Sequence, residues 1–267
     1  SEIKDVDIRN EKNNLNENGI SFYVRDNSSN ENGNYYRYEY EETYKIIAPY
    51  WNKEKLNIVK DTEPYIFEIV LDKDSIQKEI CYKTDFSTSI LQNETVSSSG
   101  NNTEFNVRFL KEDNPIFAHR YSILIKQYVQ SINAYNYFKT LSKLSTSQTV
   151  FTQNQPGKIA SNLSSTNSNN NVLGIFEVTS VSKKRIFINR QDFFPNSQTK
   201  YIKECYFSAP AFPIIVSVID ALRSNYSVFY QKNPSPDQFY GPYWLVTKAC
   251  GDCSVLGDST KPSFWID

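Results

Sequence analysis

The sequence predicts a mainly β fold, namely a fibronectin- or immunoglobulin-like β-sandwich with one amphipathic helix and irregular C-terminal extensions. Aromatic residues make up 15% of the 267 residues, and aromatic side chains favour pleated sheets. Short apolar segments recur along the chain between loops rich in Asn, Ser and Pro, as is typical of strands. Only one segment has a clear helical period.

The N-terminal part begins with residues 1–19, which are polar and indicate no strand. A strand is predicted at 20–24. In the tyrosine-rich segment 36–44, aromatic rings recur at every second position, so they should share one face of a sheet. The Asn-rich loop 26–34 separates the two segments, and we expect them to pair across it as a β-hairpin.

Further strands are expected through the rest of the chain. Their predicted ranges are 65–71, 78–83, 105–110, 120–129, 172–180 and 185–189. Segment 145–171 is predicted to be irregular, 211–223 is ambiguous between loop and short helix, and 239–244 is expected to be a loop. The aromatic end 262–265 is expected to act as a plug or anchor.

A helix is predicted at 132–144, because Ala134, Phe138 and Leu141 recur with helical spacing and Ser131 is a suitable N-cap. Its apolar face is typical of core packing. We expect a sandwich domain over 1–145 and a strand-plus-loop region over 146–267 packed on it, or else one continuous domain.

The four cysteines, Cys81, Cys205, Cys250 and Cys253, favour disulfides formed in an oxidising compartment. A zinc site would need two close pairs or additional histidines, and the chain has one histidine. A Cys250–Cys253 bridge is possible. We favour pairing of Cys250 and Cys253 with Cys81 and Cys205.

The net charge of the chain is −1. A nucleic-acid partner is therefore not expected, because binding to a phosphate backbone requires an excess of positive charge. The longest apolar run, 212–219, is too short to span a bilayer.

The chain begins without Met or a signal peptide, so we interpret it as a mature or truncated portion.

Catalytic constellations are sparse in the sequence. His119 would have to serve any Ser-His-Asp triad, and a lone histidine at the start of a strand is more typical of a structural group. Glu39, Glu41 and Glu42 could supply paired carboxylates for a hydrolase, although charges that alternate with Tyr are typical of a solvated sheet face. Calcium-loop and Gly-rich phosphate-loop patterns are absent. We therefore predict no catalytic residues, no metal and no cofactor.

Two aromatic surfaces are the candidate binding sites, because Tyr and Trp are enriched in interface cores. One is the tyrosine-rich strand, with Tyr36, Tyr38 and Tyr40, and the other is the tract that contains Tyr240, Tyr243 and Trp244. The alternative is that these rings pack the core of an aromatic-rich domain.

Several blocks resemble a Bacteroidota lipoprotein family labelled domain of unknown function 4249, and they occur in the family's order. The blocks are YRYEYEETY at 36–44 with APYW at 48–51, RYSILIKQY at 120–128 with AYNYF at 134–138, VLGIF at 172–176 with KRIFI at 184–188, and CGDC at 250–253 with KPSFW at 261–265. The chain departs from the family at Ser161 and Asp258, where glycines are common. Members usually begin with a lipoprotein signal, a lipidated Cys and an immunoglobulin-like domain, so we expect this chain to be the C-terminal portion of such a protein.

The resemblance implies a location and a partner but no activity. Members look like lipid-anchored outer-membrane proteins of the cell surface, often paired with TonB-dependent transporters. We therefore expect a non-catalytic component that associates with an outer-membrane β-barrel protein of the TonB-dependent transporter type, with membrane attachment only through a lipid anchor outside this chain. A free-standing glycan- or peptide-binding module is the alternative.

Overall fold

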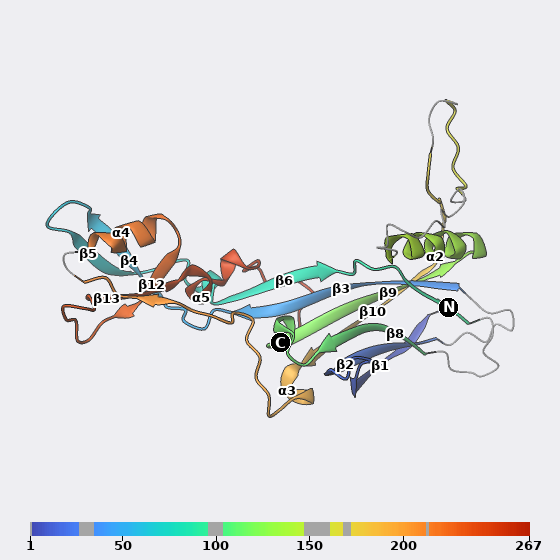
Figure 1. Cartoon of the computed structure of the whole chain (residues 1–267), viewed down its shortest axis with the longest axis horizontal. Coiled ribbons are helices and arrows are strands. Elements are labelled where there is room, and N and C mark those ends of the chain that lie inside the picture. Colours follow the sequence, from blue (N-terminus) through green and yellow to red (C-terminus); the bar gives the residue numbers. More distant parts are fainter. Residues whose placement is uncertain (1, 27–34, 96–103, 147–160, 168–171, 212–213) are drawn as a thin grey trace. The chain divides into compact units, whose positions relative to one another are not determined.

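The computed structural model describes residues 2–26, 35–95, 104–146, 161–167, 172–211 and 214–267 (Figure 1). It is mainly β with several antiparallel sheets, which confirms the predicted fold class at this level. The strands are β1 (Ile3–Lys12), β2 (Asn18–Asp26), β3 (Tyr35–Ile47), β4 (Glu54–Lys60), β5 (Ile66–Leu71), β6 (Ile80–Phe86), β7 (Leu91–Glu94), β8 (Glu104–Lys111), β9 (Arg120–Gln130), β10 (Val181–Asn189), β11 (Phe207–Ser208), β12 (Ser227–Lys232) and β13 (Tyr243–Thr247).

The helices are short apart from α2. They are α1 (Ile76–Glu79), η1 (Pro115–Phe117), α2 (Ile132–Thr146), α3 (Arg190–Phe193), α4 (Val216–Arg223), α5 (Lys248–Gly251) and η2 (Cys253–Val255). Within the described part of the chain, no helix is both long and apolar enough to cross a membrane.

The chain divides into two compact units. Unit 1 contains residues 1–42, 85–112 and 122–186, and unit 2 contains residues 43–84, 113–121 and 187–267. Strands β3, β6, β9 and β10 contribute residues to both units. The predicted division near residue 145 stays a prediction.

Unit 1 contains two layers of strands. The sheet β1-β2-β8 buries one face of each strand, and β3 and β9 belong to a second sheet with the strand order β10-β9-β3-β6. The ring of Tyr38 in β3 stacks on Phe105 of β8, with 4.9 Å between the ring centroids. Apolar and aromatic side chains from both sheets form the core: Ile20, Phe22, Val24, Tyr36, Tyr38, Val107, Leu110, Ile123 and Ile125.

Two predictions for the N-terminal region are wrong. Strand β2 pairs with β1 and β8, so the expected hairpin with the tyrosine-rich strand does not form. The polar segment 1–19 contains β1, because Val6 is buried while the charges of Asp5, Asp7 and Arg9 occupy the other face. This alternation is a period-two signal, and the polar composition obscured it. The loop 27–34 lies outside the described residues.

Helix α2 confirms the predicted amphipathic helix. The Oγ of Ser131 accepts a hydrogen bond from the N–H of Ala134 at 3.2 Å, which is an N-cap. Ala134 and Tyr135 are buried, and the Tyr135 ring contacts Tyr35 of β3 at 4.8 Å. The helix therefore packs its apolar face into unit 1, and the irregular segment predicted after it lies mostly outside the described residues.

Unit 2 has a separate small core. Leu56, Val218, Phe229 and Leu245 are buried together, from strand β4, helix α4 and strands β12 and β13. Strands β4 and β5 form a two-stranded antiparallel sheet, and β13 lies between β11 and β12. Helix α4 resolves the ambiguous segment 211–223 as a helix over its second part. Strands β4 and β12 were not predicted.

The last segment of unit 2 is held against β6. Tyr82 and Asp258 exchange two main-chain hydrogen bonds of 2.8 Å. A Cβ at Gly257 would lie 2.6 Å from the carbonyl oxygen of Tyr82, so this close approach requires glycine. Trp265 is buried against the rings of Tyr82 and Phe187, which confirms the predicted aromatic plug.

Two predictions for the C-terminal half, one of a strand and one of a loop, need correction. Residues 172–180 are not a strand, although the N–H of Val129 donates to the carbonyl of Ser180 at 3.2 Å. The tract 239–244 is a loop only as far as Pro242, since β13 begins at Tyr243. In both places the apolar composition did not show which residues form hydrogen bonds with a neighbouring strand.

Candidate functional site

The tyrosine-rich strand β3 places its rings inside unit 1. Tyr36 and Tyr38 are buried, and Tyr40 is half-buried beside the guanidinium of Arg108, 5.6 Å from the ring centroid. The predicted sharing of one sheet face is correct. A ligand cannot reach Tyr36 or Tyr38 in this structure, so their observed role is core packing.

The candidate catalytic carboxylates of β3 are all bonded to cations. Glu39 pairs with Arg37 and accepts a hydrogen bond from the Tyr128 hydroxyl at 2.8 Å. Burial opposes its ionisation, yet these bonds lower the pKa of Glu39 below its usual value. Burial and the bond to Glu39 raise the pKa of Tyr128 to about 12. A carboxyl with a lowered pKa is a poor general acid at neutral pH.

The other two carboxylates are held in the same way. Glu41 pairs with Lys126 and lies 3.9 Å from the guanidinium of Arg185. Glu42 is buried and bonded to Arg108 at 3.0 Å. These pairs fix both side chains structurally, as expected for charges that are partly buried and paired.

The second aromatic tract is only partly accessible. Tyr243 packs against the rings of Phe67 and Phe229 in the unit 2 core, and burial raises its pKa. Tyr240 is 52% exposed, and its ring contacts Trp244 at 5.3 Å. Phe239 is 72% exposed. The accessible part of this tract is therefore Phe239 and Tyr240.

The cysteines form two disulfides, both within unit 2. Cys81 is bonded to Cys253 and Cys205 to Cys250, which confirms the favoured pairing. The alternative Cys250–Cys253 bridge and the four-cysteine zinc site are both wrong, because every thiol is used in these two bonds. Among the described residues, no group of three or more His, Cys, Asp or Glu side chains is placed to hold a metal ion.

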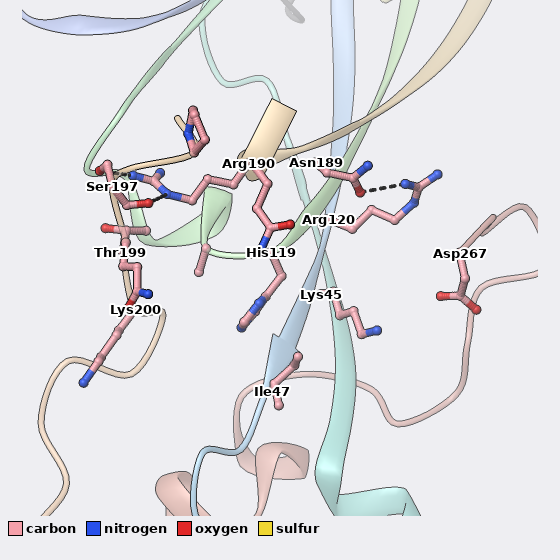
Figure 2. Close-up of a pocket in the computed structure, with 14 residues that line it drawn as sticks. Lys45, Ile47, His119, Arg120, Asn189, Arg190, Ser197, Thr199, Lys200 and Asp267 are labelled. Atoms are coloured by element: carbon pink, nitrogen blue, oxygen red, sulfur yellow. Dashed lines mark hydrogen bonds between the residues drawn. The ribbon is translucent and has the colours of Figure 1, made fainter. Parts of the chain in front are cut away.

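Unit 2 also contains a cavity of about 760 Å³, which we call the basic cavity (Figure 2). Four Lys or Arg side chains line it, against one carboxylate, that of Asp267. The cationic residues are Lys45, Arg120, Arg190 and Lys200, and His119 lies between them. Amide and hydroxyl side chains complete the polar wall: Asn189, Gln191, Ser197, Gln198 and Thr199.

Two local structures position the cavity wall. Asn114 caps η1 through a 3.1 Å bond from the N–H of Ile116, and the chain then places His119 at the start of β9. Asn189 and Asp192 form a capping box around α3. This box fixes the first turn of α3, where Arg190 stands.

Both arginines of the cavity are anchored. Arg190 is buried, donates to the Ser197 hydroxyl at 2.7 Å, and lies over the rings of Phe117 and Phe194. Arg120 donates from Nη1 to the side-chain oxygen of Asn189 at 2.7 Å (Figure 2). Its Nε donates to the carbonyl of Ile266, and its guanidinium lies 5.2 Å from the centroid of the Phe187 ring. These contacts preorganise the guanidinium groups.

The environment of the two lysines of the cavity differs from that of its arginines. Across the part of the chain that the structure describes, neither Lys45 nor Lys200 forms an ion pair. Asp267, the carboxylate of the cavity, pairs instead with Lys261 outside it, and this bond lowers the pKa of Asp267. Burial, followed by the charge of Lys45, lowers the pKa of His119. The imidazole is therefore neutral at pH 7 within a positively charged site.

A smaller hollow of about 160 Å³ adjoins the basic cavity. It shares Ile47, His119, Thr199 and Lys200 with the cavity and adds apolar side chains from Pro49, Tyr201 and Ile202. A polar cavity that continues into an apolar hollow can hold a molecule with a charged end and an apolar body.

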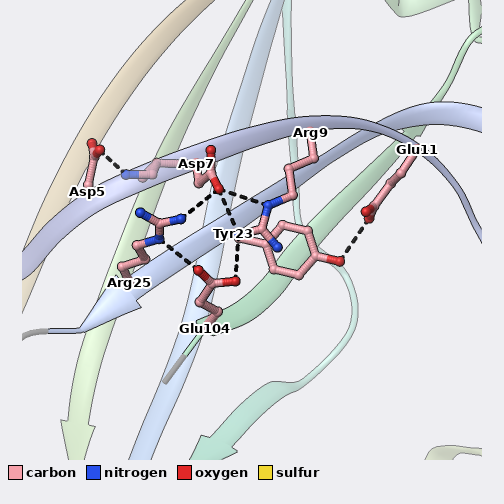
Figure 3. A network of polar contacts seen from close by, with 8 residues as sticks. Asp5, Asp7, Arg9, Glu11, Tyr23, Arg25 and Glu104 are labelled. Carbon is pink, nitrogen blue, oxygen red and sulfur yellow. Dashed lines mark hydrogen bonds and ion pairs between the residues drawn. The ribbon is translucent and has the colours of Figure 1, made fainter. Parts of the chain in front are cut away.

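The exposed face of β1 and β2 in unit 1 carries a charge network that is internally satisfied (Figure 3). Arg9 and Arg25 each pair with both Asp7 and Glu104, at 2.6–2.9 Å. Arg9 also lies 4.4 Å from the centroid of the Tyr23 ring. Because cations and carboxylates are matched, this face offers less to an ionic ligand than the basic cavity does.

The basic cavity was not predicted from the sequence. Its cations come from positions 45, 120, 190 and 200, and no local pattern joins them. His119 was singled out as the lone histidine and interpreted as structural, but the structure places it in the cavity wall. The capping box at 189–192 was the one local signal for order in this segment.

Fold and site together define a mainly β, disulfide-bonded protein with a cation-lined cavity. The family model described as "Domain of unknown function (DUF4249)" matches residues 1–185. The chain belongs to this family, which confirms the family resemblance, while its last block at 250–265 lies outside the matched range. No curated protein and no solved structure matches the chain.

Proposed function

We propose that this protein acts by binding, as a non-catalytic, lipid-anchored component of the outer-membrane surface in Bacteroidota. The observation that carries the proposal is the basic cavity. Its arginines are oriented by hydrogen bonds, and its lysines form no ion pair with any residue that the structure describes. Preorganised groups of this kind favour ligand recognition. The carboxylates that a hydrolase would need are bonded to Arg37, Lys126 and Arg108.

Export is supported by the two disulfides, since such bonds persist in oxidising compartments. The lipid anchor and the outer-membrane location come from the family resemblance. We also propose that the two layers of unit 1 form a fibronectin- or immunoglobulin-like sandwich, and the Tyr38–Phe105 contact between the layers supports this.

The proposed partner is a TonB-dependent transporter, bound through the accessible aromatic pair Phe239 and Tyr240. Exposed aromatic rings contribute large contact areas to interfaces. The test is co-purification of the tagged natural protein from detergent-solubilised outer membranes of its host. We expect the transporter to be recovered with the wild type and lost with the double variant Phe239→Ser/Tyr240→Ser.

Phe86→Ser provides the matched control, because Phe86 is 63% exposed and belongs to unit 1. This variant should recover the transporter as the wild type does. Recovery of the wild-type chain alone under gentle extraction would count against the transporter partnership.

A free-standing glycan- or peptide-binding module is the second candidate. It is favoured by the volume of the basic cavity, about 760 Å³, which falls within the usual range for small-molecule sites. In this case the isolated chain should bind a ligand in a glycan or peptide screen without any membrane partner.

A further inference from the structure

We propose that the basic cavity of unit 2 binds a small organic anion that carries carboxylate or phosphate groups, with Lys45 and Arg120 as its charge partners. This inference rests on the proposed binding function and names the chemical class of the ligand. It concerns only residues of unit 2, since every residue of the cavity wall belongs to that unit.

The first argument is the charge balance of the wall. Four cationic side chains face one carboxylate, and that carboxylate is already paired with Lys261. Like charges gathered in a partly enclosed space repel one another, and an anion relieves this repulsion. Burial, followed by the charge of Lys45, lowers the pKa of His119, so the imidazole adds little positive charge of its own to this wall.

The second argument is the availability of donors. A guanidinium has five N–H groups, and the bonds of Arg120 to Asn189 and Ile266 use its Nη1 and Nε. Its orientation is set while N–H groups remain for a ligand, and a planar guanidinium suits carboxylate and phosphate oxygens. Lys45 and Arg120 extend to the same side of His119, whereas the Lys200 side chain points to the opposite side (Figure 2). Lys45 therefore adds the ammonium group beside Arg120. Arg190 is committed to Ser197 and supplies charge rather than a contact.

The third argument is the apolar hollow beside the charged wall. Ile47 and His119 line both spaces, and Pro49, Tyr201 and Ile202 extend the hollow. An inorganic ion would leave this surface unused, whereas an organic anion places its acidic group among the cations and its carbon skeleton against the apolar side chains. The neutral imidazole of His119 can donate or accept one hydrogen bond where the two regions meet.

The test is calorimetric titration of the full chain at low salt with two organic probes, phenylacetate for carboxylates and phenyl phosphate for phosphates. We expect at least one probe to bind, and the responding probe identifies the acidic group. The variant Lys45→Gln should bind that probe about tenfold more weakly or worse. Lys83→Gln/Lys232→Gln is the matched control, because both lysines are exposed, belong to unit 2 and lie outside the cavity. It should bind like the wild type.

A second measurement, proton NMR of His119 with and without the probe, requires no substitution in the cavity. The chain has one histidine, so its C2 proton gives a single signal of this kind. A bound anion should raise the pKa of this imidazole. Failure of both probes to bind, or wild-type affinity in the cavity variant, would overturn the proposal. Continued recovery of the transporter with the tagged protein would then show that the anion site is wrong while the proposed transporter partnership through Phe239 and Tyr240 stands.

Discussion

Cys81 in β6 is bonded to Cys253, which lies 172 positions later in the chain. Beside this bond, the main chains of Tyr82 and Asp258 pair through two hydrogen bonds. The second disulfide, Cys205–Cys250, closes a loop with a sequence separation of 45. Both bonds hold the last segment of unit 2 to other parts of the same unit.

Removal of either disulfide should destabilise the protein strongly. The chain-entropy relation gives about 5 kcal/mol for the Cys81–Cys253 loop and about 4 kcal/mol for the Cys205–Cys250 loop. Denaturant unfolding of Cys81→Ser/Cys253→Ser and of Cys205→Ser/Cys250→Ser tests this order. Peptide mapping without reductant checks the pairing, and a peptide that contains a Cys250–Cys253 bridge would contradict it.

Gly257→Ala should lower the free energy of unfolding by about 1–3 kcal/mol. The added methyl group would lie 2.6 Å from the main-chain oxygen of Tyr82, and main chain cannot move as a flexible side chain does. Thermal unfolding measures the loss. Val255→Ala, at a neighbouring site that is 47% exposed, should unfold nearly as the wild type does.

Glu42→Gln should lower the free energy of unfolding by about 3 kcal/mol or more, because it removes the negative charge that pairs with the Arg108 guanidinium in a mostly buried site. Glu104→Gln is the comparison, since Glu104 also pairs with arginines but lies in the exposed network of Figure 3. Its effect should stay within about 1 kcal/mol. Denaturant unfolding measures both variants. Equal losses in the free energy of unfolding would show that burial does not make the Glu42–Arg108 pair contribute more to stability than the pairs of Glu104.

His119 should titrate below its usual pKa of 6.5, because burial and then Lys45 disfavour its charged form. Since the folded pKa is the lower one, the unfolded chain binds this proton more readily, and the contribution of His119 to stability is lost as the pH falls below about 6.5. Proton NMR of the single histidine measures the value directly.

Lys45→Met provides the matching variant for this titration. It should raise the pKa of His119 but leave it below 6.5, because burial is the larger cause. Lys83→Met should not change the pKa. A value at or above 6.5 in the wild type would mean that the imidazole is neither buried nor beside a cation.

Strand-forming segments with uninterrupted β-branched and aromatic residues were predictable from the sequence, as was the helix that begins after Ser131. Strand β1 was missed because Asp5, Asp7 and Arg9 made its composition polar, although Val6 and Ile8 preserve the alternation. The strand at 105–110 was predicted, but no local pattern showed that β2 pairs with this distant strand, β8, and not with β3.

The sites show the same division between local and long-range information. An even number of cysteines indicated disulfides. The favoured pairing of Cys250 and Cys253 with Cys81 and Cys205 was correct, although the sequence left a Cys250–Cys253 bridge open. The tyrosine pattern predicted a shared face, but only the packing of Tyr38 on Phe105 showed that this face is internal. The basic cavity joins Lys45 to Lys200 through the tertiary structure of unit 2, so it could not be predicted from sequence spacing.

The central claim is that this protein works by binding a partner at the outer membrane. Native mass spectrometry of the tagged natural protein, released from its host membrane in mild detergent, tests the claim most directly. The account predicts an assembly heavier than the chain by the mass of a TonB-dependent transporter. A spectrum that contains only the bare chain would contradict it.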